Sequence, residues 1–384
     1  MPQVGVEIWT AAIAFAIALP LTAAIRLPTK VGRNGERTSK MGGFSILAGF
    51  VAAPFIMAFF SDEARAFITE DKRQFLALAG CAALVCLMGA RDDFRDVDWR
   101  LKLGTQVFAG LILYFNGYHI DRMTLPGGGT VALGLLDPVV TVLWIVLVTN
   151  AVNLIDGRDG VAAGVAALVS GTMAYVAWDL QHPLIAMLFA ALAGASLGFL
   201  PFNLTKARRF LGDSGAYLIG FCIAGLSIAA ALDETGRVPL YIPLVALGLP
   251  ILDTGVAFLR RFLDGRHPMQ FDFDHFHDRM ERNFHLSPLQ VTLATYVLTV
   301  AFCVAALLAH TWYKSVGSAV VGALVLVFAI LLVVLLGYGR SMRNSARVVA
   351  WRGRGTPRMR DGSSQPSAGR GRSPAAKEPA PPAR

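Results

Sequence analysis

The chain has few charged residues for its size, and this shortage limits the class of protein to which it can belong. Asp, Glu, Lys and Arg make up 16% of its 384 residues, whereas 55% are hydrophobic and the mean hydropathy is +0.54. A soluble protein of this length needs more polar side chains to cover its surface. The composition therefore excludes a water-soluble globular protein.

Cysteine is also scarce. The chain has four cysteines, each inside an apolar segment: Cys81, Cys86, Cys222 and Cys303. Their spacing matches neither a disulfide framework nor a zinc site, so we expect them to serve in packing.

Long apolar runs are what the chain has in abundance. Each is long enough to cross roughly 30 Å of hydrocarbon at 1.5 Å per helical residue. About eleven such runs lie near residues 7–25, 43–60, 74–90, 103–118, 138–155, 160–178, 184–202, 214–232, 239–259, 289–311 and 318–338. They predict an all-α polytopic membrane protein with about eleven transmembrane helices, ten being the alternative. The first run has no charged segment before it and no cleavage site, so we interpret it as a span.

The distribution of Lys and Arg predicts the orientation of these helices. Eighteen of the 35 basic residues lie in one set of loops, six lie in the opposite set, and eleven lie in the tail from Arg340. Basic loops stay in the cytoplasm, so we expect the N-terminus outside and the C-terminus inside. Residues 1–338 are expected to form the integral membrane domain. Residues 339–384, rich in Pro, Ser, Gly and Arg, are expected to form a disordered cytosolic tail.

The first polar motif on the basic face lies where the third run ends. Asp92 and Asp93 are adjacent there, and Lys102 opens the next run. Adjacent carboxylates repel each other, which favours a general base, or they share a cation. The alternative is a solvated loop whose acids pair with neighbouring arginines.

The second motif places Asn150, Asn153, Asp156 and Asp159 three residues apart at the end of the fifth run. If the helix continues, successive groups lie within about 60° of one another and form one polar stripe. Such groups are costly at membrane depth unless they face a partner, a metal or a water-filled cleft. An interhelical hydrogen-bond seam is the alternative, and it explains the asparagines better than the acids.

The third motif, residues 210–215, opens the eighth run after three basic residues. A helix N-terminus with glycines and the Asp213 carboxylate could hold a phosphate with its divalent metal, although Asp213 could also be a simple N-cap. Phe210 could stack on a flat base or anchor the chain at the membrane interface.

The fourth motif, in the long inner loop, contains His275 and His277 among acids. Two such histidines could bind a metal, bind phosphate as imidazolium or shuttle protons, whereas the lack of Cys disfavours zinc. Hard oxygen ligands, basic residues and histidines on one face indicate Mg²⁺-assisted chemistry on a phosphorylated substrate. The depth of the polar stripe indicates that the other substrate is a lipid.

In this order the motifs resemble those of the polyprenyl-phosphate N-acetylhexosamine-1-phosphate transferases. This is glycosyltransferase family 4, which includes undecaprenyl-phosphate GlcNAc-1-phosphate transferase and phospho-N-acetylmuramoyl-pentapeptide transferase. The resemblance extends from about Arg33 to Arg282. It implies a cytosolic active-site cleft and transfer of a sugar-1-phosphate from a UDP-sugar to polyprenyl phosphate, with release of UMP. It also implies a need for Mg²⁺, with Mn²⁺ as the alternative ion.

The resemblance assigns each candidate residue a role. It implies catalytic roles for Asp92, Asp93, Asp156, His275 and His277, substrate-binding roles for Lys102, Asp159, Phe210, Lys40 and Arg37, and Mg²⁺ binding by Asn153 and Asp213. One of the paired aspartates would deprotonate the lipid phosphate, Lys102 would contact pyrophosphate, and Asp159 with Phe210 would recognise uracil. The histidines would engage phosphate. Asp278 stands where the amino-sugar subgroup often has another His, and Ser39 stands where the early family segment has Pro.

We therefore expect an enzyme of the bacterial plasma membrane that starts cell-surface polysaccharide synthesis. Its expected partners are a UDP-sugar, polyprenyl phosphate and the membrane, without nucleic acid and with a homodimer left open. The muramoyl-pentapeptide transferase of peptidoglycan synthesis is the alternative within the family, and a covalent aspartyl intermediate is the alternative route. An ion- or proton-coupled transporter is the alternative of another class, but it would place acids near mid-membrane and show related halves.

Overall fold

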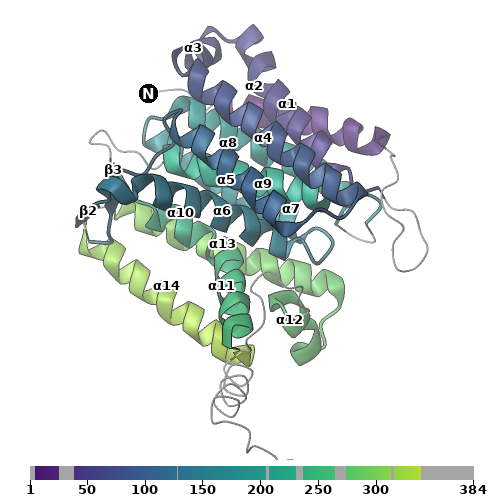
Figure 1. Ribbon diagram of the computed structural model, residues 1–384, viewed down its shortest axis with the longest axis vertical. Helices are drawn as coiled ribbons and strands as arrows, with labels where there is room; N and C mark the ends of the chain where they lie inside the picture. The colour runs from purple at the N-terminus through teal and green to yellow at the C-terminus, as the bar shows by residue number, and fades with distance from the viewer. Residues whose placement is uncertain are drawn as a thin grey trace, which may run out of the picture.

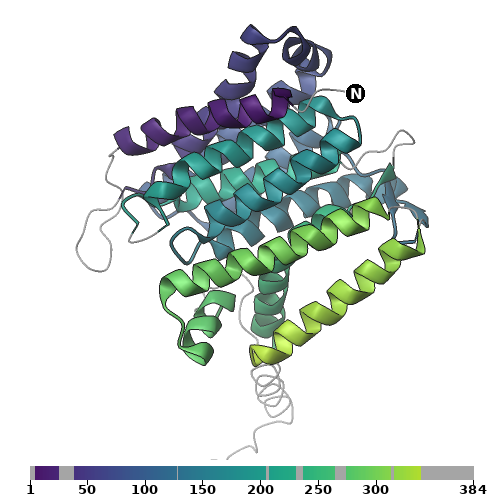
Figure 2. The same ribbon diagram turned by 180° about the vertical axis from the view of Figure 1, so that it is seen from behind.

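The computed structural model describes residues 5–25, 39–127, 129–204, 207–230, 237–263, 274–312 and 315–338, which form a bundle of α-helices (Figures 1 and 2). The helices are α1 (Gly5–Ala24), α2 (Gly42–Phe60), α3 (Asp62–Glu70), α4 (Lys72–Phe94), α5 (Trp99–Tyr114), α6 (Asp137–Ile155), α7 (Val161–Asp179), α8 (Pro183–Phe199), α9 (Gly212–Ala230), α10 (Tyr241–Ala246), α11 (Gly248–Leu263), α12 (Phe276–Phe284), α13 (Pro288–Thr311) and α14 (Val316–Leu335). Within the described part of the chain, nine helical segments are long and apolar enough to cross a membrane. The protein is therefore an all-α polytopic membrane protein, as predicted. The predicted tail, residues 339–384, lies outside the described residues.

Two of the predicted runs are not among these nine segments. The run at 103–118 corresponds to α5, which has 16 residues. The run at 239–259 is divided at Leu247 into α10 and α11. Pro250 has no N–H to donate to the carbonyl of Ala246, and this missing hydrogen bond favours the break. Beyond it, α11 lies crosswise to α13 (Figure 1).

The centre and the edge of the bundle are both apolar but differ in what surrounds them. Helix α9 packs against α2, α4, α6, α7 and α8, and 94% of it is buried. Helix α14 is only 17% buried and lies at the edge (Figure 1). Apolar side chains on α9 therefore contact protein, whereas those on α14 suit lipid. The four cysteines are buried and unbonded, as expected for packing residues.

A small sheet lies at the end of the bundle away from α12 (Figures 1 and 2). The segment 119–137 contains β1 (Arg122–Thr124) paired antiparallel with β2 (Thr130–Ala132). A third strand, β3 (Arg237–Val238), pairs parallel with β1. The sequence has no local signal for β3, because its partner lies more than a hundred residues away in the chain.

Candidate functional site

Acidic side chains from the first and third motifs meet where the end of α4 faces the start of α9. The Nζ atom of Lys102 lies 2.6 Å from Oδ2 of Asp92 and 3.6 Å from Oδ2 of Asp213. The amide nitrogen of Asn153 lies 3.4 Å from Oδ1 of Asp213. These four side chains come from α4, α5, α6 and α9, so the fold brings together residues that the sequence only placed on one face.

Asp93 lies against the N-terminus of α9. Its carboxylate oxygens accept the backbone N–H groups of Asp213 and Ser214, both at 3.1 Å. The close approach needs glycine, because a Cβ on Gly89 would lie 2.4 Å from the carbonyl oxygen of Asp213. Gly212, with φ of +71°, makes the left-handed turn before the helix. The capping role considered for Asp213 thus belongs to Asp93, which leaves the Asp213 carboxylate directed at other side chains.

The polar stripe predicted for residues 150–159 is interrupted, because α6 ends at Ile155. Asn150 donates to Oε1 of Gln106 at 2.6 Å, which is the interhelical seam considered as the alternative. Asn153 remains on the helix and faces α9. Because the backbone turns after Ile155, the two aspartates of the motif leave the helix surface and lie on the loop before α7.

Asp156 is the first residue of that loop. Part of the residue stays exposed, but burial among protein atoms raises the pKa of its carboxyl well above the usual value. The negative charges of Asp213 and Asp93 raise this pKa further, while Lys40 opposes them. An acid among acids is stabilised by protonation or by a cation. Asp156 belongs to a group of polar side chains, the carboxylate cluster, which consists of Lys40, Asp92, Asp93, Lys102, Asn153, Asp156 and Asp213.

The second aspartate of the loop, Asp159, is held by backbone and side-chain contacts. Its Oδ2 accepts the N–H of Ala207 at 3.0 Å. The next residue, Gly160, donates its N–H to Asn203 at 2.8 Å and accepts the hydroxyl of Tyr296 at 2.7 Å. Sequence reasoning missed Asn203 and Tyr296. Asn203 could have been found in the sequence, because it is a lone Asn at the end of an apolar run and a buried amide needs hydrogen-bond partners.

Lys40 and Phe210 lie on two chain segments that pair through their backbones. Phe210 donates its N–H to the carbonyl of Ser39 at 3.0 Å, and its own carbonyl accepts the N–H of Gly42 at 3.2 Å. This exchange fixes Lys40 beside the start of α9, with Phe210 half-buried. Arg37, the other basic candidate of this segment, lies outside the described residues.

A cavity of about 510 Å³ opens beside the loop that follows α6. It is lined by residues 157–159, Leu204, residues 287–289 and Thr292. Its size falls within the range of roughly 300–1,000 Å³ that is typical of small-molecule sites. Asp159 therefore borders a space that a nucleotide-sized group could enter.

The two predicted histidines lie at the start of α12. The rings of His275 and His277 are stacked, with centroids 5.9 Å apart and planes at 13°. His277 packs on the loop after α6, since a Cβ on Gly157 would lie 2.5 Å from its Nε2. Burial lowers the pKa of His277, although the charges of Asp278 and Asp253 oppose this shift. The histidine pair thus joins α12 to the loop that carries Asp156.

The donor atoms of the carboxylate cluster fit a magnesium ion bound together with a substrate. Within the described ranges, no three His, Cys, Asp or Glu side chains gather into a metal cage. Mg²⁺ does not require one, because it is commonly held by one or two protein oxygens, substrate phosphates and waters. Asn153 and Asp213 are adjacent, and rotating the Asn153 amide would direct its oxygen to the same point.

Comparisons with known proteins identify relatives of this chain. Residues 75–231 match the family model described as glycosyl transferase family 4. A probable undecaprenyl-phosphate N-acetylglucosaminyl 1-phosphate transferase of Bacillus subtilis strain 168 is 30% identical over 285 residues, covering 74% of this chain and 76% of the relative. A decaprenyl-phosphate N-acetylglucosaminephosphotransferase of Mycobacterium tuberculosis H37Rv is 29% identical, covering 71% and 72%.

A third relative matches over a shorter length. The phospho-N-acetylmuramoyl-pentapeptide-transferase of Enterococcus faecalis is 32% identical over 203 residues, which are 50% of this chain and 61% of the relative. The matched residues 75–231 contain every member of the carboxylate cluster except Lys40. On this similarity and the shared membrane fold, the chain belongs to glycosyl transferase family 4 and is a sugar-phosphate transferase of the membrane.

Proposed function

We propose that the protein transfers N-acetylhexosamine 1-phosphate from a UDP-sugar to a polyprenyl phosphate. An oxygen of the lipid phosphate attacks the β-phosphorus of the UDP-sugar. The bond between this phosphorus and the bridging oxygen breaks, so that polyprenyl-diphosphate-sugar forms and UMP leaves. The product would initiate a cell-surface polysaccharide.

The observation that carries the proposal is the convergence of Asp92, Lys102, Asn153 and Asp213 from four helices. A site with more carboxylates than bases suits a divalent cation, and phosphoryl transfer depends mainly on positioning and charge neutralisation. Mg²⁺ bound there would neutralise the charge that develops on the departing UMP. Asn153 and Asp213 are the residues that would hold it.

The other residues have roles that follow from their contacts. Lys102 keeps an ammonium group between two carboxylates, where it can also contact a phosphate oxygen of the substrate. Both carboxylates have hydrogen-bond partners: Asp93 accepts two backbone N–H groups of α9, and Asp92 accepts the N–H of Val97 at 2.7 Å and faces Lys102. Asp92 is only half-buried, whereas Asp93 is 3% exposed, so Asp92 is the one that a substrate can reach. We therefore assign the removal of the proton from the lipid phosphate to Asp92, with Asp93 holding α9 in place.

The nucleotide is proposed to occupy the cavity beside Asp159. The carboxylate of Asp159 borders this space and could accept from an N–H of uracil, while Phe210, half-buried before α9, could stack on the base. Lys40 and the two histidines at α12 would contact phosphate groups from either side. A covalent intermediate on an aspartate is the alternative route.

An amino-sugar donor such as UDP-N-acetylglucosamine is favoured over a muramoyl-pentapeptide donor. The N-acetylglucosamine-phosphate transferases align over 72–76% of their own length, whereas the muramoyl-pentapeptide transferase aligns over 61%. Asp92 ends α4, Asp213 begins α9 and Asp156 follows α6, so the acids lie at helix ends. This arrangement supports a site at one membrane face, proposed to be the cytoplasmic face, and disfavours a transporter with a mid-membrane site.

Purified protein tests the proposal when it is incubated with polyprenyl phosphate and a panel of UDP-sugars. UMP release should require the lipid phosphate and Mg²⁺, and it should be fastest with one N-acetylhexosamine donor. Chelation should stop release, and added Mg²⁺ should restore it, with Mn²⁺ as the other ion to try. Absence of UMP release from every donor in the presence of both ions and the lipid would reject the function.

A further inference from the structure

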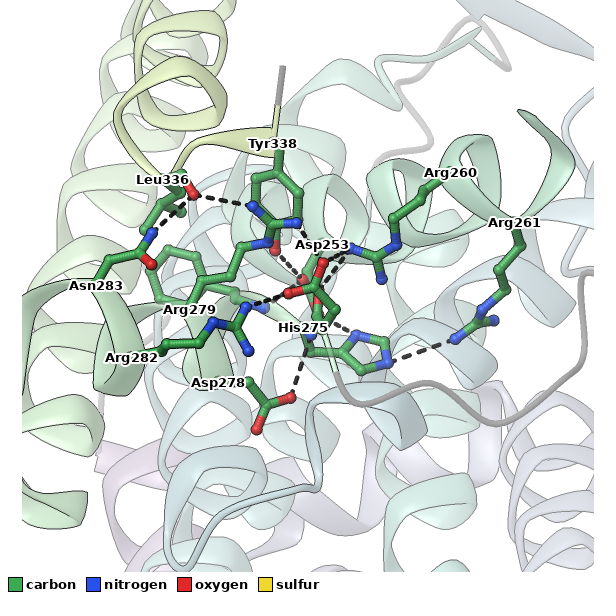
Figure 3. Close-up of polar contacts among 12 residues, drawn as sticks. Asp253, Arg260, Arg261, His275, Asp278, Arg279, Arg282, Asn283, Leu336 and Tyr338 are labelled. Atoms are coloured by element: carbon green, nitrogen blue, oxygen red, sulfur yellow. Dashed lines mark hydrogen bonds and ion pairs between the residues drawn. The ribbon is translucent and has the colours of Figure 1, made fainter. Parts of the chain in front are cut away.

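A buried aspartate on the crosswise helix α11 lies behind His275 (Figure 3). Asp253 is only 3% exposed. Its Oδ2 lies 2.8 Å from Nδ1 of His275. Its Oδ1 accepts the N–H of Phe276 at 2.7 Å and the hydroxyl of Tyr338 at 3.1 Å. Both oxygens of this carboxylate are therefore bound, by donors from the start of α12 and from the chain beyond α14.

These contacts determine which nitrogen of the His275 ring carries a hydrogen. A carboxylate only accepts hydrogen bonds, so Nδ1 must donate. Nε2, on the other side of the ring, lies 3.5 Å from Nη2 of Arg261 (Figure 3). Nε2 is thus the ring nitrogen that does not face Asp253, and a guanidinium lies beside it.

Docking of α12 onto α11 does not by itself require Asp253. A second carboxylate, Asp274, receives Arg260 of α11 at 2.7 Å and also pairs with Arg279 and Arg282 of α12. These ion pairs already join the two helices. A buried aspartate directed at a histidine ring therefore has a more specific effect, which is to set the orientation and tautomer of that ring.

We propose that Asp253 is a positioning residue that holds the His275 imidazole in its Nδ1–H tautomer and directs Nε2, beside Arg261, at a substrate phosphate. The inference rests on the proposed function, because the phosphate belongs to one of the two substrates of that reaction. In this tautomer Nε2 is an acceptor, so it can accept a hydrogen bond from a protonated oxygen of the phosphate. His275, not Asp253, would touch the substrate.

The test compares the full-length protein with Asp253→Asn, His275→Asn and the double variant. Asp253→Asn should lower kcat/KM for UMP release by about 10- to 100-fold, the loss typical of partners that orient a functional histidine. In the His275→Asn background the same substitution should have no further effect. Separate KM values for the UDP-sugar and for polyprenyl phosphate identify the phosphate concerned.

A readout that needs no turnover separates this inference from the proposed function. In ¹⁵N-histidine NMR spectra, the Nδ1–H signal that His275→Asn removes should switch to an Nε2–H signal in Asp253→Asn. Failure of the wild-type protein to release UMP would reject the function, while the spectra would still test the tautomer. An unchanged Nδ1–H signal, or additive losses in the double variant, would overturn the role of Asp253.

Two further variants control for folding. Tyr338→Phe removes another donor to Asp253 but keeps the contact with His275, so it should keep the Nδ1–H signal of His275. If Asp253→Asn does not purify as a folded protein, Asp253→Glu replaces it, because Glu retains a carboxylate. Asp253→Glu should then retain the Nδ1–H signal, and loss of this signal would contradict the inference.

Discussion

The carboxylate cluster and the network at α11 and α12 use the same kinds of side chain with opposite charge balance. The carboxylate cluster has four aspartates against two lysines. The second region, the arginine network, has three aspartates against four arginines: Asp253, Asp274, Asp278, Arg260, Arg261, Arg279 and Arg282. Uncompensated charge in a partly buried site is costly unless a ligand of opposite sign binds. The first region therefore suits a cation and the second an anion, and a nucleotide diphosphate with its metal ion would satisfy both.

The two regions also differ in how they are held. The carboxylate cluster sits on long helices that pack around α9, and the N-terminus of α9 is capped from α4 by Asp93. The arginine network sits on the crosswise helix α11, the short helix α12 and the end of α14, which ion pairs and hydrogen bonds join. Loss of a metal-binding side chain should thus impair chemistry in the first region, whereas loss of a buried ion-pair partner should impair stability in the second.

The largest expected effect is the loss of activity in Asp213→Asn. This substitution removes the negative charge that is proposed to hold the metal ion while keeping the shape of the side chain. Removal of one such electrostatic contribution typically costs on the order of 10²–10³-fold in kcat, and more where a metal ion is lost with it. UMP release should therefore be abolished at an unchanged melting temperature.

The matched control for that variant is Asp62→Asn. Asp62, in the first turn of α3, has a side chain that is 94% exposed, and it pairs with Arg65. It is an aspartate at a helix start, like Asp213, but it lies outside the carboxylate cluster. Turnover should stay at the wild-type rate, and near-normal turnover in Asp213→Asn would refute the metal assignment.

In the arginine network the expected loss is one of stability, and Asp274→Asn should show it. The substitution leaves the buried guanidinium groups of Arg260 and Arg279 without their shared carboxylate. Removing one partner of a buried ion pair costs about 3 kcal/mol. Arg282→Gln is the control, because this arginine is 56% exposed and should contribute less than about 1 kcal/mol. Equal melting temperatures for the two variants would contradict the division between the regions.

A smaller effect on stability is expected for Lys102→Met. Near pH 8 this variant should lose about 1.5–3 kcal/mol, because Asp92 and Asp213 lose a charged hydrogen-bond donor. The deficit should shrink on acidification, since protonation removes the repulsion between the carboxylates. Melting curves at pH 5 and pH 8 measure both values. A deficit that is the same at both pH values would mean that Lys102 acts through packing alone.

The smallest expected effect is the contribution of His277 to the stability of the folded protein at acid pH. Burial lowers the pKa of this ring, so below the ordinary value of about 6.5 the unfolded chain binds a proton more readily than the folded protein. The stabilising contribution of the neutral His277 ring is fully present above the ordinary pKa of about 6.5 and is lost as the pH falls through the lowered pKa of the folded protein. His277→Gln should therefore reduce acid destabilisation, by less than about 1 kcal/mol. Identical shifts of melting temperature with pH in both proteins would exclude this contribution.

Much of the candidate site could be predicted because its residues stand out in the sequence. Asp92, Asp213 and the acids after α6 interrupt apolar runs at their ends, where charged side chains are rare without a reason. The same argument could have found Asp253, a lone acid inside the predicted run 239–259. It was missed because that run was interpreted as one continuous span, whereas the helix breaks at Leu247.

Other features had no local signal. The capping of α9 by Asp93 joins residues 120 positions apart, and the pairing of Asn150 with Gln106 joins residues 44 apart. The loop after Ile155, which carries two aspartates away from the helix face, is anchored at Gly160 by Asn203 and Tyr296 from distant parts of the chain. Hydrophobic periodicity carries no information about such distant partners.

The sequence by itself determined that the chain crosses a membrane and where its long helices lie. The reason is that the length of an apolar run is a local property, matched to the thickness of the hydrocarbon layer. Only the tertiary structure decided which aspartates share a lysine, which one caps α9 and which one orients His275. Those choices depend on which helices pack together, and packing is set by contacts between distant parts of the chain.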